Sequence, residues 1–573
     1  MTDLEDVQLE SLEIGAVPIV RTFMDHLELD QLLESYVPRR RLGREPKIST
    51  SRVISVLIAN ILVSRRPLYA IRDWMQDYVP DPFHLEKAEV NLLNDDRIGR
   101  ALDHLYEADR ASLMTSVVTR AIKVFKIDMK QLHNDTTTIT FSGAYENQKD
   151  KNDRVRPPFI TFGKNKDHRP DLKQLVYSLT VSADGAVPIH HKTYDGNKTD
   201  DKIHIETWSI LRDLVGSPDF LYVADSKLCT RENMEYITSQ GGSFITVLPR
   251  TRAEYEDFKS QLRSGEVIEW EEIIRKENPR GKEKDEVVYK AFEGKASSEG
   301  YRIIWYRSSQ KIVLDEKARR SRIAKAKKQI ETLQNRTGKH QFKTEETALE
   351  AAREVLKSTG VERWLDVSVE THIGYDYKQT TPGRPGKDTQ YTREECPFIL
   401  FFVEENAENI KADALCDGIF PLITNQEVEN LSPEDVLAKY KYQPFLEKRN
   451  EQLKSVYHVR PILAHNPERV SSLLFIYYLA LLLWSLIERE IRRKMKEHNI
   501  ASLPLYPEMR ECTAPTTDGV FQTIQGIRRH RLMGENENVL KIFYDALSPV
   551  AIESLELLGV DCGYYGINLG RKK

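Results

Sequence analysis

The stretch LHNDTTTITFSG, from Leu132 to Gly143, decides the fold. It overlaps an alternating run, Lys130–Phe141, whose β-branched and aromatic residues predict a strand. Asp135 interrupts this run, although aspartate is depleted in strands because its short side chain is better solvated in turns and helix caps. Two interpretations follow: Asp135 is a tolerated surface residue, or it is kept in the strand to hold a ligand.

The residues that follow this stretch predict a fixed order of further elements. Two more strands come next, joined by an Ala-Asp-Gly turn signal, and then helices alternate with strands up to about residue 250. The order β-β-β-α-β-α-β allows the first and fourth strands to be neighbours in one sheet. The predicted elements after the first strand are strands Gln174–Val181 and Ala186–Tyr194, helix Lys202–Leu214, strand Phe220–Ala224, helix Arg231–Gln240 and strand Ser243–Leu248.

Two aspartates would then lie on neighbouring strands. Asp135 is in the middle of the first strand, and Asp225 is at the carboxyl-terminal edge of the fourth. Such a pair can share Mg²⁺, which prefers oxygen ligands and usually combines one or two protein carboxylates with substrate phosphate. Two ions ~3.5–4 Å apart would activate an attacking oxygen and stabilise a leaving one. For either aspartate alone, a turn or cap residue is the commoner interpretation.

A third acid lies in a polar series further along the chain. Tyr440, Gln443, Glu447 and Lys454 are separated by 3, 4 and 7 residues. On one continuous helix these steps place all four on one face. The acid could then hold a metal ion while the tyrosine and the lysine hold phosphate. The alternative is an ordinary solvated face, which is the usual fate of Glu–Lys pairs at this spacing.

Length and composition indicate a globular protein of several domains. The chain has 573 residues, of which 30% are charged and 40% hydrophobic, and its formal net charge is −4. These values indicate a globular rather than a disordered chain and argue against a polybasic protein, but they say nothing about local patches of charge. The predicted regions are a helical region at 1–125, the first part of a catalytic core at 126–250, an insertion at 251–430, the second part of the core at 431–510 and a C-terminal region at 511–573.

The sequence predicts a cytoplasmic protein. Its first residues lack a basic region followed by an apolar run, so no secretory signal is predicted. The apolar run Leu473–Ile487 is shorter than the ~20 residues of a membrane span and predicts a buried core helix. The cysteines contain no close pair, which excludes a CxxC metal site and fits reduced thiols. They are Cys229, Cys396, Cys416, Cys512 and Cys562.

The polar series resembles the Y-x2-R-x3-E-x6-K signature of DDE transposases from bacterial insertion sequences, with Gln443 in place of the arginine. Asp135 followed by Thr137 resembles the first-aspartate motif of that family, and Val223-Ala224-Asp225 resembles the second. The resemblance extends over most of the chain. Other similar stretches are Gly163–Leu175, Tyr194–Asp200 and Asp417–Asn425.

The resemblance implies an α/β fold with an RNase H-like core, that is, a mixed five-stranded sheet with flanking helices. A large α+β insertion would interrupt this core, and a helical N-terminal domain would bind DNA or dimerise. Asp135, Asp225 and Glu447 would be catalytic and would bind two Mg²⁺ ions, with Mn²⁺ able to substitute. The implied chemistry is hydrolysis at transposon ends, followed by attack of the freed 3′-hydroxyl on target DNA.

The implied partner is double-stranded DNA, both terminal inverted repeats and target, bound by a homodimer at the bacterial nucleoid and not at a membrane. Gln443 would offer DNA phosphate only neutral hydrogen bonds, where an arginine offers a charged fork. His133 shares a strand face with Asp135, so it lies near the metal ions or is a core histidine. The expected DNA contacts are Tyr440, Gln443, Lys454, Arg460, Lys164, Lys166 and Arg169.

Two other functions remain open from sequence. One is a metal-dependent nuclease on the same core that cuts DNA without strand transfer. The other is a non-catalytic DNA-binding protein derived from a transposase, which predicts that at least one of the three acids is lost. All three acids are present in this chain.

Overall fold

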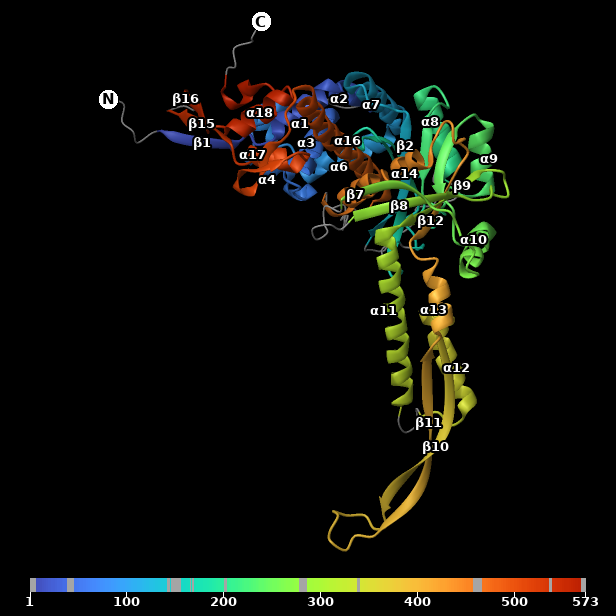
Figure 1. The fold of residues 1–573 in the computed structure, drawn as a ribbon. Coiled ribbons are helices and arrows are strands. Elements are labelled where there is room, and N and C mark those ends of the chain that lie inside the picture. The colour runs from blue at the N-terminus through green and yellow to red at the C-terminus, as the bar shows by residue number, and fades with distance from the viewer. Residues whose placement is uncertain are drawn as a thin grey trace. The chain divides into compact units, whose positions relative to one another are not determined.

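The chain divides into two units, and the first is discontinuous in sequence. Unit 1 comprises Met1–Thr246 and Ala438–Lys573, and unit 2 comprises Val247–Leu437. In this computed structural model both units combine helices with strands and the largest sheet is mixed, so the chain is of the mixed α/β class (Figure 1). The insertion expected at 251–430 falls within unit 2. The structure describes residues 7–38, 46–141, 145, 156–164, 166, 169–199, 203–277, 286–336, 341–456, 466–534 and 538–567.

Strand β2 (Gln131–Phe141) is central to the sheet of unit 1. It pairs antiparallel with β3 (Lys173–Ser182), which pairs antiparallel with β4 (Pro188–Tyr194). On its other side β2 pairs parallel with β5 (Leu221–Ala224), which pairs parallel with β6 (Ser243–Val247). The order β4-β3-β2-β5-β6 confirms that the first and fourth predicted strands are neighbours.

β2 is a buried strand, and this explains its composition. Its apolar residues Leu132, Ile139 and Phe141 are buried, and so are the threonines between Asp135 and Phe141. A strand that is covered on both faces has nearly all of its residues buried. The β-branched threonines fit such a pleated surface. Helices α8 (His204–Val215) and α9 (Arg231–Ser239) follow β4 and β5 along the chain, close to where the sequence predicts them.

Helix α16 (Pro467–Glu497) is the core helix of unit 1. It packs against α3 (Thr50–Val63), α6 (Asp95–Glu107) and β4, and almost every residue of its apolar run is buried. Among the described residues, α16 is long and apolar enough to cross a membrane, but 94% of its apolar window is buried inside the protein. The predicted core helix is therefore confirmed.

Other elements of unit 1 surround α16 and its sheet. The N-terminal residues are mainly helical, as predicted, but β1 (Gln8–Glu13) pairs with β15 (Arg528–Met533) near the other end of the chain. The remaining helices are α1 (Val17–His26), α2 (Leu29–Tyr36), α4 (Ile71–Asp77), α5 (Lys87–Val90), α7 (Arg110–Phe125), α15 (Gln443–Glu451), α17 (Thr517–Thr523) and α18 (Pro549–Leu557). The remaining strands are β13 (Leu503–Tyr506), β14 (Arg510–Cys512) and β16 (Val539–Tyr544).

Unit 2 combines antiparallel strands with a helix-supported hairpin. Strands β12, β9, β8 and β7 lie in that order, and helices α11 and α12 pack against the base of the hairpin formed by β10 and β11. Its strands are β7 (Glu271–Glu277), β8 (Glu286–Glu293), β9 (Arg302–Ser308), β10 (Leu365–Gln379), β11 (Tyr391–Glu405) and β12 (Ile419–Thr424). Its helices are α10 (Ala253–Arg263), α11 (Ser309–Gln334), α12 (Glu345–Thr359) and α13 (Ala407–Ala414), and α14 (Pro433–Tyr440) follows at its end.

A buried ion pair joins two distant segments of unit 2. The guanidinium of Arg319 on α11 bonds both carboxylate oxygens of Asp417, at 2.9 and 2.5 Å. The two side chains are 8% and 9% exposed, so each charge offsets the cost of removing the other from water. This pair therefore fixes α11 relative to the segment just before β12.

Candidate active site

The register of β2 and β5 places two aspartates at one level of the sheet. Asn134 pairs with Ala224 in the parallel ladder, and the next residue on each strand is Asp135 and Asp225. Asp225 directly follows β5, where the chain leaves the sheet. Its carbonyl oxygen accepts a hydrogen bond from Thr246 Oγ1 at 2.5 Å, and its Oδ1 accepts one from the backbone N–H of Lys227 at 3.0 Å. The backbone at Asp225 is thus held in place.

Helix α15 carries the third acid and is fastened to β2 on both sides of it. Gln443 donates from Nε2 to the carbonyl oxygen of Asn134 at 3.3 Å, and Asn450 donates from Nδ2 to Oδ2 of Asp135 at 3.1 Å. Glu447 lies one helical turn from each of these residues and therefore shares their face. Its side chain is exposed, whereas Gln443 and Asn450 are buried.

The prediction of one continuous helix through Tyr440 and Lys454 is wrong. Helix α14 ends at Tyr440 and α15 begins at Gln443. Pro444 stands in the first turn of α15, where its missing N–H costs nothing, but a proline at this position interrupts a helix arriving from the N-terminal side. After α15 the chain forms a π turn over Gln452–Val456, which includes Lys454. The polar series therefore spans three segments rather than one face.

His133 is a core histidine, and Gln443 is its partner. Gln131 Nε2 donates to His133 Nε2 at 2.7 Å, which leaves Nδ1 to donate to Gln443 Oε1 at 2.9 Å. Burial lowers the pKa of His133 to about 4, so its ring is neutral near pH 7. Gln443 is 5% exposed and both ends of its amide are used inside the protein. The structure thus places Gln443 beneath the site, and not at the surface where a DNA phosphate would be met.

The carboxylate of Asp135 lies within electrostatic range of the other two acids. Its pKa is raised to about 6, mainly because burial disfavours the charged form. Lys166 opposes this shift from 3.7 Å, and the negative charges of Asp225 and Glu447 add to it. Lys166 is itself anchored through Nζ to the carbonyl oxygen and the hydroxyl of Thr136, at 2.5 and 3.0 Å.

Tyr440, at the end of α14, also lies within electrostatic range of all three acids. Its pKa is raised to about 12, first by burial and then by the charges of Asp225, Glu447 and Asp135. A single phenol hydroxyl thus experiences all three carboxylates. With that pKa the hydroxyl keeps its proton at neutral pH and remains a hydrogen-bond donor.

The three acids offer the donor set that a hard divalent cation requires. Carboxylate oxygens are the protein ligands that Mg²⁺ prefers, and mutual repulsion between the three charges is relieved by a cation. Among the described residues, no group of three or more His, Cys, Asp or Glu side chains already stands at metal-binding distances. The residues therefore fit Mg²⁺ by chemistry, and their side chains would have to close around an ion to complete the group.

The other predicted DNA contacts fall in different places. Lys166 lies beside Asp135, as described above, and Lys454 is partly buried in the π turn. Lys164 is exposed, and Arg169 is exposed and paired with Asp171 through two bonds of 2.8 and 2.6 Å. Arg460 lies outside the described residues. The structure thus brings Tyr440 and Lys166 to the carboxylates and leaves Lys164 and Arg169 at the surface.

Sequence reasoning missed Asn450 as a member of the site. This residue follows Glu447 by three positions, and that spacing places two side chains on the same helix face. Its amide is the direct partner of Asp135. The spacing of Asn450 from Glu447 would therefore have been enough to predict it as a site residue.

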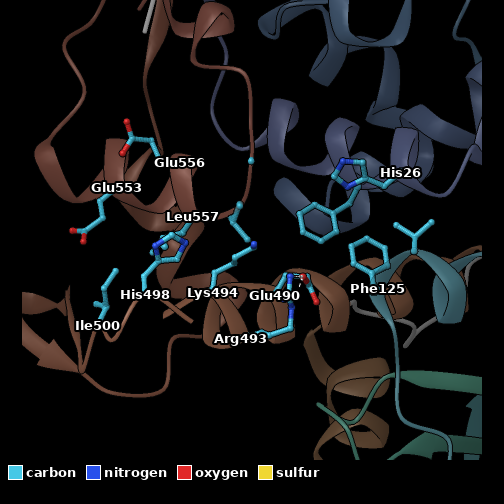
Figure 2. A pocket seen from close by; sticks show the side chains of 14 residues that line it. His26, Phe125, Glu490, Arg493, Lys494, His498, Ile500, Glu553, Glu556 and Leu557 are labelled. Carbon is cyan, nitrogen blue, oxygen red and sulfur yellow. Dashed lines mark hydrogen bonds and ion pairs between the residues drawn. The ribbon is translucent and has the colours of Figure 1, made fainter. Parts of the chain in front are cut away.

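A separate cavity of about 530 Å³ lies elsewhere in unit 1 (Figure 2). Phe23 and Phe125 stack in its wall with ring centroids 5.6 Å apart, and Arg493 and Glu490 are ion-paired at its margin. None of the three acids lines this cavity. The carboxylates and the cavity are therefore distinct features.

Comparison with known proteins identifies the N-terminal part of the chain as similar to a known family. Residues 9–119 match the model of a family described as a domain of unknown function, DUF4277. No curated protein matches the chain. A solved structure of a pre-cleavage Mos1 transpososome is similar at 10% identity, over 40% of this chain and 76% of that chain, with a TM-score of 0.14. The family match ends before Asp135, so the function rests on the geometry of the site.

Proposed function

We propose that this protein is a DNA transposase of the DDE class, acting with Mg²⁺ on an RNase H-like core. The observation that carries the proposal is the convergence of Asp135, Asp225 and Glu447. They come from three elements far apart in sequence, yet Asp135 and Tyr440 each experience the charges of the others. Carboxylates close enough for their charges to raise the pKa of one of them, here Asp135, are costly to maintain and are typical of catalytic sites.

The topology of unit 1 supports the same proposal. Strand order β4-β3-β2-β5-β6, with three antiparallel strands followed by two parallel ones, is the arrangement expected for an RNase H-like sheet. Unit 2 interrupts unit 1 between the segment of Asp225 and that of Glu447, as expected for a transposase with an insertion. The resemblance in sequence and the position of the insertion are independent of the carboxylate geometry.

Each side chain of the site would have a defined task. Asp135, Asp225 and Glu447 would hold the ions, which when bound supply Lewis acidity at the scissile phosphate. Asn450 orients the Asp135 carboxylate through its 3.1 Å hydrogen bond. Tyr440, protonated at neutral pH, and the Lys166 ammonium can donate to non-bridging phosphate oxygens. Gln443 and His133 hold α15 against β2 from below.

The proposed partner is double-stranded DNA, at terminal inverted repeats and at a target, bound by a homodimer in the cytoplasm near the nucleoid. Lys164 and Arg169 are exposed cations that could contact the DNA backbone, and such contacts would make binding depend on salt. A nuclease without strand transfer would use the same carboxylates and differs only in the last step.

The test compares isosteric variants on a plasmid carrying the DNA that flanks the gene on both sides. Wild-type protein should cut this plasmid in Mg²⁺ or Mn²⁺, and Asp135→Asn, Asp225→Asn and Glu447→Gln should each reduce cutting by ~10³-fold or more. Glu451→Gln, one turn further along α15, is the matched control and should cut like wild type. If any of the three variants cuts like wild type, the assignment is wrong.

Adding a second plasmid as a target distinguishes a transposase from a nuclease. If excised ends are joined to the target plasmid in an Mg²⁺-dependent reaction, the protein is a transposase. If both plasmids are cut and nothing is joined, it is a nuclease. No metal-dependent cutting of the flanking DNA, together with retained binding to it, would indicate a non-catalytic DNA-binding protein.

A further inference from the structure

One face of the unit 2 hairpin is largely apolar and packs against helices only at its base, while further out the guanidinium of Arg393 lies over the ring of Tyr375, 3.6 Å from its centroid. There Val367, Val369 and Phe401 pack into a core with α11 and α12. Alternate residues further along β10 lie on the same face, because side chains alternate along a strand. Figure 1 shows the hairpin continuing past α12. In this outer part Ile373, Tyr375, Tyr377 and Tyr391 are 59%, 47%, 65% and 50% exposed.

The two edges of the hairpin are also protected only at its base. Thr371 of β10 donates its backbone N–H to Glu345 Oε1 at 2.8 Å, and Phe401 of β11 donates its own to Gln334 Oε1 at 3.2 Å. These N–H groups point outward, so every second residue along each strand does the same. Within the described residues, the outward N–H groups of Ile373, Tyr375 and Tyr377 have no such cap.

The edges differ in their ability to accept another strand. Pro397 stands opposite Ile373, at an outward-pointing position of β11, and has no N–H to offer. Strand β10 contains no proline. A long, proline-free strand edge next to exposed apolar side chains is a template for strand pairing, and a two-stranded hairpin alone is only marginally stable. The available edge is therefore that of β10.

We propose that β10 pairs antiparallel with β10 of a second copy of this chain, around a two-fold axis at Gly374, to form a four-stranded sheet. In this register Ile373 of one copy lies opposite Tyr375 of the other, with their outward backbone groups hydrogen-bonded. The exposed aromatic rings of both copies then share one face, where cross-strand pairs stabilise a sheet. The inference names an interface for the homodimer proposed above, and it uses no residue of the carboxylate site, so failure of this interface leaves the proposed catalytic function untouched.

Charge favours a second copy over a nucleic acid as the occupant. The register centred on Gly374 sets Glu370 opposite Lys378 and His372 opposite Asp376, so each charged side chain meets an opposite or titratable partner. Within one hairpin Lys378 also pairs with Glu394. The outer segment, residues 373–397, has no net charge, which suits a self-complementary protein interface rather than a phosphate backbone. Its charged residues are Lys378, Arg384, Lys387, Arg393, Asp376, Asp388, Glu394 and Glu395.

The first experiment measures the mass of the full-length protein by light scattering after gel filtration, without DNA or metal. Wild type should have twice the mass of one chain, and Tyr375→Pro should have the mass of one chain. Proline at this outward position removes the pairing N–H and leaves the ladder between β10 and β11 intact. Glu395→Pro is the matched control, because it alters an outward position of β11, and it should remain dimeric. Monomeric wild type, or dimeric Tyr375→Pro, would overturn the proposal.

The second experiment uses charge to test the register. Glu370→Lys and Lys378→Glu should each be monomeric, because like charges meet across the axis. Mixing the two variants should restore a dimer containing one copy of each, since the lysine introduced at position 370 of one copy then faces the glutamate introduced at position 378 of the other. Absence of a mixed dimer would reject this register. If Tyr375→Pro stays dimeric but loses binding to a DNA duplex, the face is a DNA contact and the proposal fails.

Discussion

Asn450 donates a hydrogen bond from Nδ2 to Oδ2 of Asp135 at 3.1 Å, while its own Oδ1 is buried and has no partner among the described residues. The amide therefore has a fixed end and an open end. The fixed end sets the direction of the Asp135 carboxylate, and the open acceptor is available to a water molecule or substrate group. A buried polar atom without a protein partner calls for an explanation, and a place for a bound water molecule or substrate group supplies one here.

Replacing Asn450 by alanine should weaken the site without unfolding it. If Asp135 holds a metal ion as proposed, loss of its orienting partner should cost ~10–100-fold in metal affinity or activity. We expect Asn450→Ala to weaken Mn²⁺ binding, measured by calorimetry, and to slow DNA cutting by a similar factor. Glu451→Gln, on the next position of the helix, should change neither. Equal Mn²⁺ affinity in wild type and Asn450→Ala would show that Asn450 does not position Asp135.

Asp135→Asn should stabilise the metal-free protein at high pH. Because the folded state raises the pKa of Asp135 from 3.8 to about 6, the folded protein binds more protons than the unfolded chain between these values. Stability therefore falls as pH rises through this window, and the full penalty of ~3 kcal/mol is present above it.

Denaturant unfolding in a chelator measures this effect. At pH 8 Asp135→Asn should be more stable than wild type by ~1–3 kcal/mol, and below pH 4 the difference should vanish. A difference that does not change with pH would mean that the ionised carboxylate carries no such cost.

Gln443→Ala should destabilise unit 1 by ~1–3 kcal/mol, because it leaves Nδ1 of the buried His133 ring without its partner and removes a hydrogen bond to the carbonyl oxygen of Asn134. Gln443→Arg should be at least as harmful, since it buries a charge where the amide is 5% exposed. Lys448→Gln, at an exposed position of the same helix, should stay within ~0.5 kcal/mol of wild type. Thermal unfolding compares the three, and a neutral Gln443→Arg would show that residue 443 reaches solvent.

Arg319→Met should unfold part of unit 2. Removing one member of a buried ion pair costs ~3–5 kcal/mol, because the partner charge of Asp417 is left uncompensated. Arg320, the next residue, pairs with Glu316 at the surface and is 78% exposed, so Arg320→Met should cost at most ~1 kcal/mol. Limited proteolysis should detect early cleavage within residues 247–437 for the first variant only. Equal resistance of both would contradict the role of the pair.

Local patterns predicted the sheet of unit 1 well. The strands from β2 to β6, the two helices between them and the core helix α16 all have strong periodicity, and the order of elements was sufficient to place Asp135 beside Asp225. Pro444 indicated a helix break between Tyr440 and Gln443. The regular spacing of the polar residues nevertheless favoured a single continuous helix, and that prediction is wrong. Asn450 was not predicted, although its spacing of three residues from Glu447 places it on the same helix face.

Other features leave no local trace. The pairing of β1 with β15 places Gln8 opposite Met533, and the residue pattern of neither strand predicts which strand it will pair with. The burial of Gln443 depends on His133, more than 300 residues away. Such contacts are set by tertiary packing, which outweighs the preferences of individual residues.

The discontinuity of unit 1 also has a consequence for synthesis on the ribosome. Asp135 and Asp225 emerge early, but Glu447 and α16 follow only after the whole of unit 2 has been translated. A nascent or prematurely terminated chain therefore lacks both an acid of the site and the core helix beneath its sheet. Any DNA-cutting activity of this protein would be withheld until translation is nearly complete.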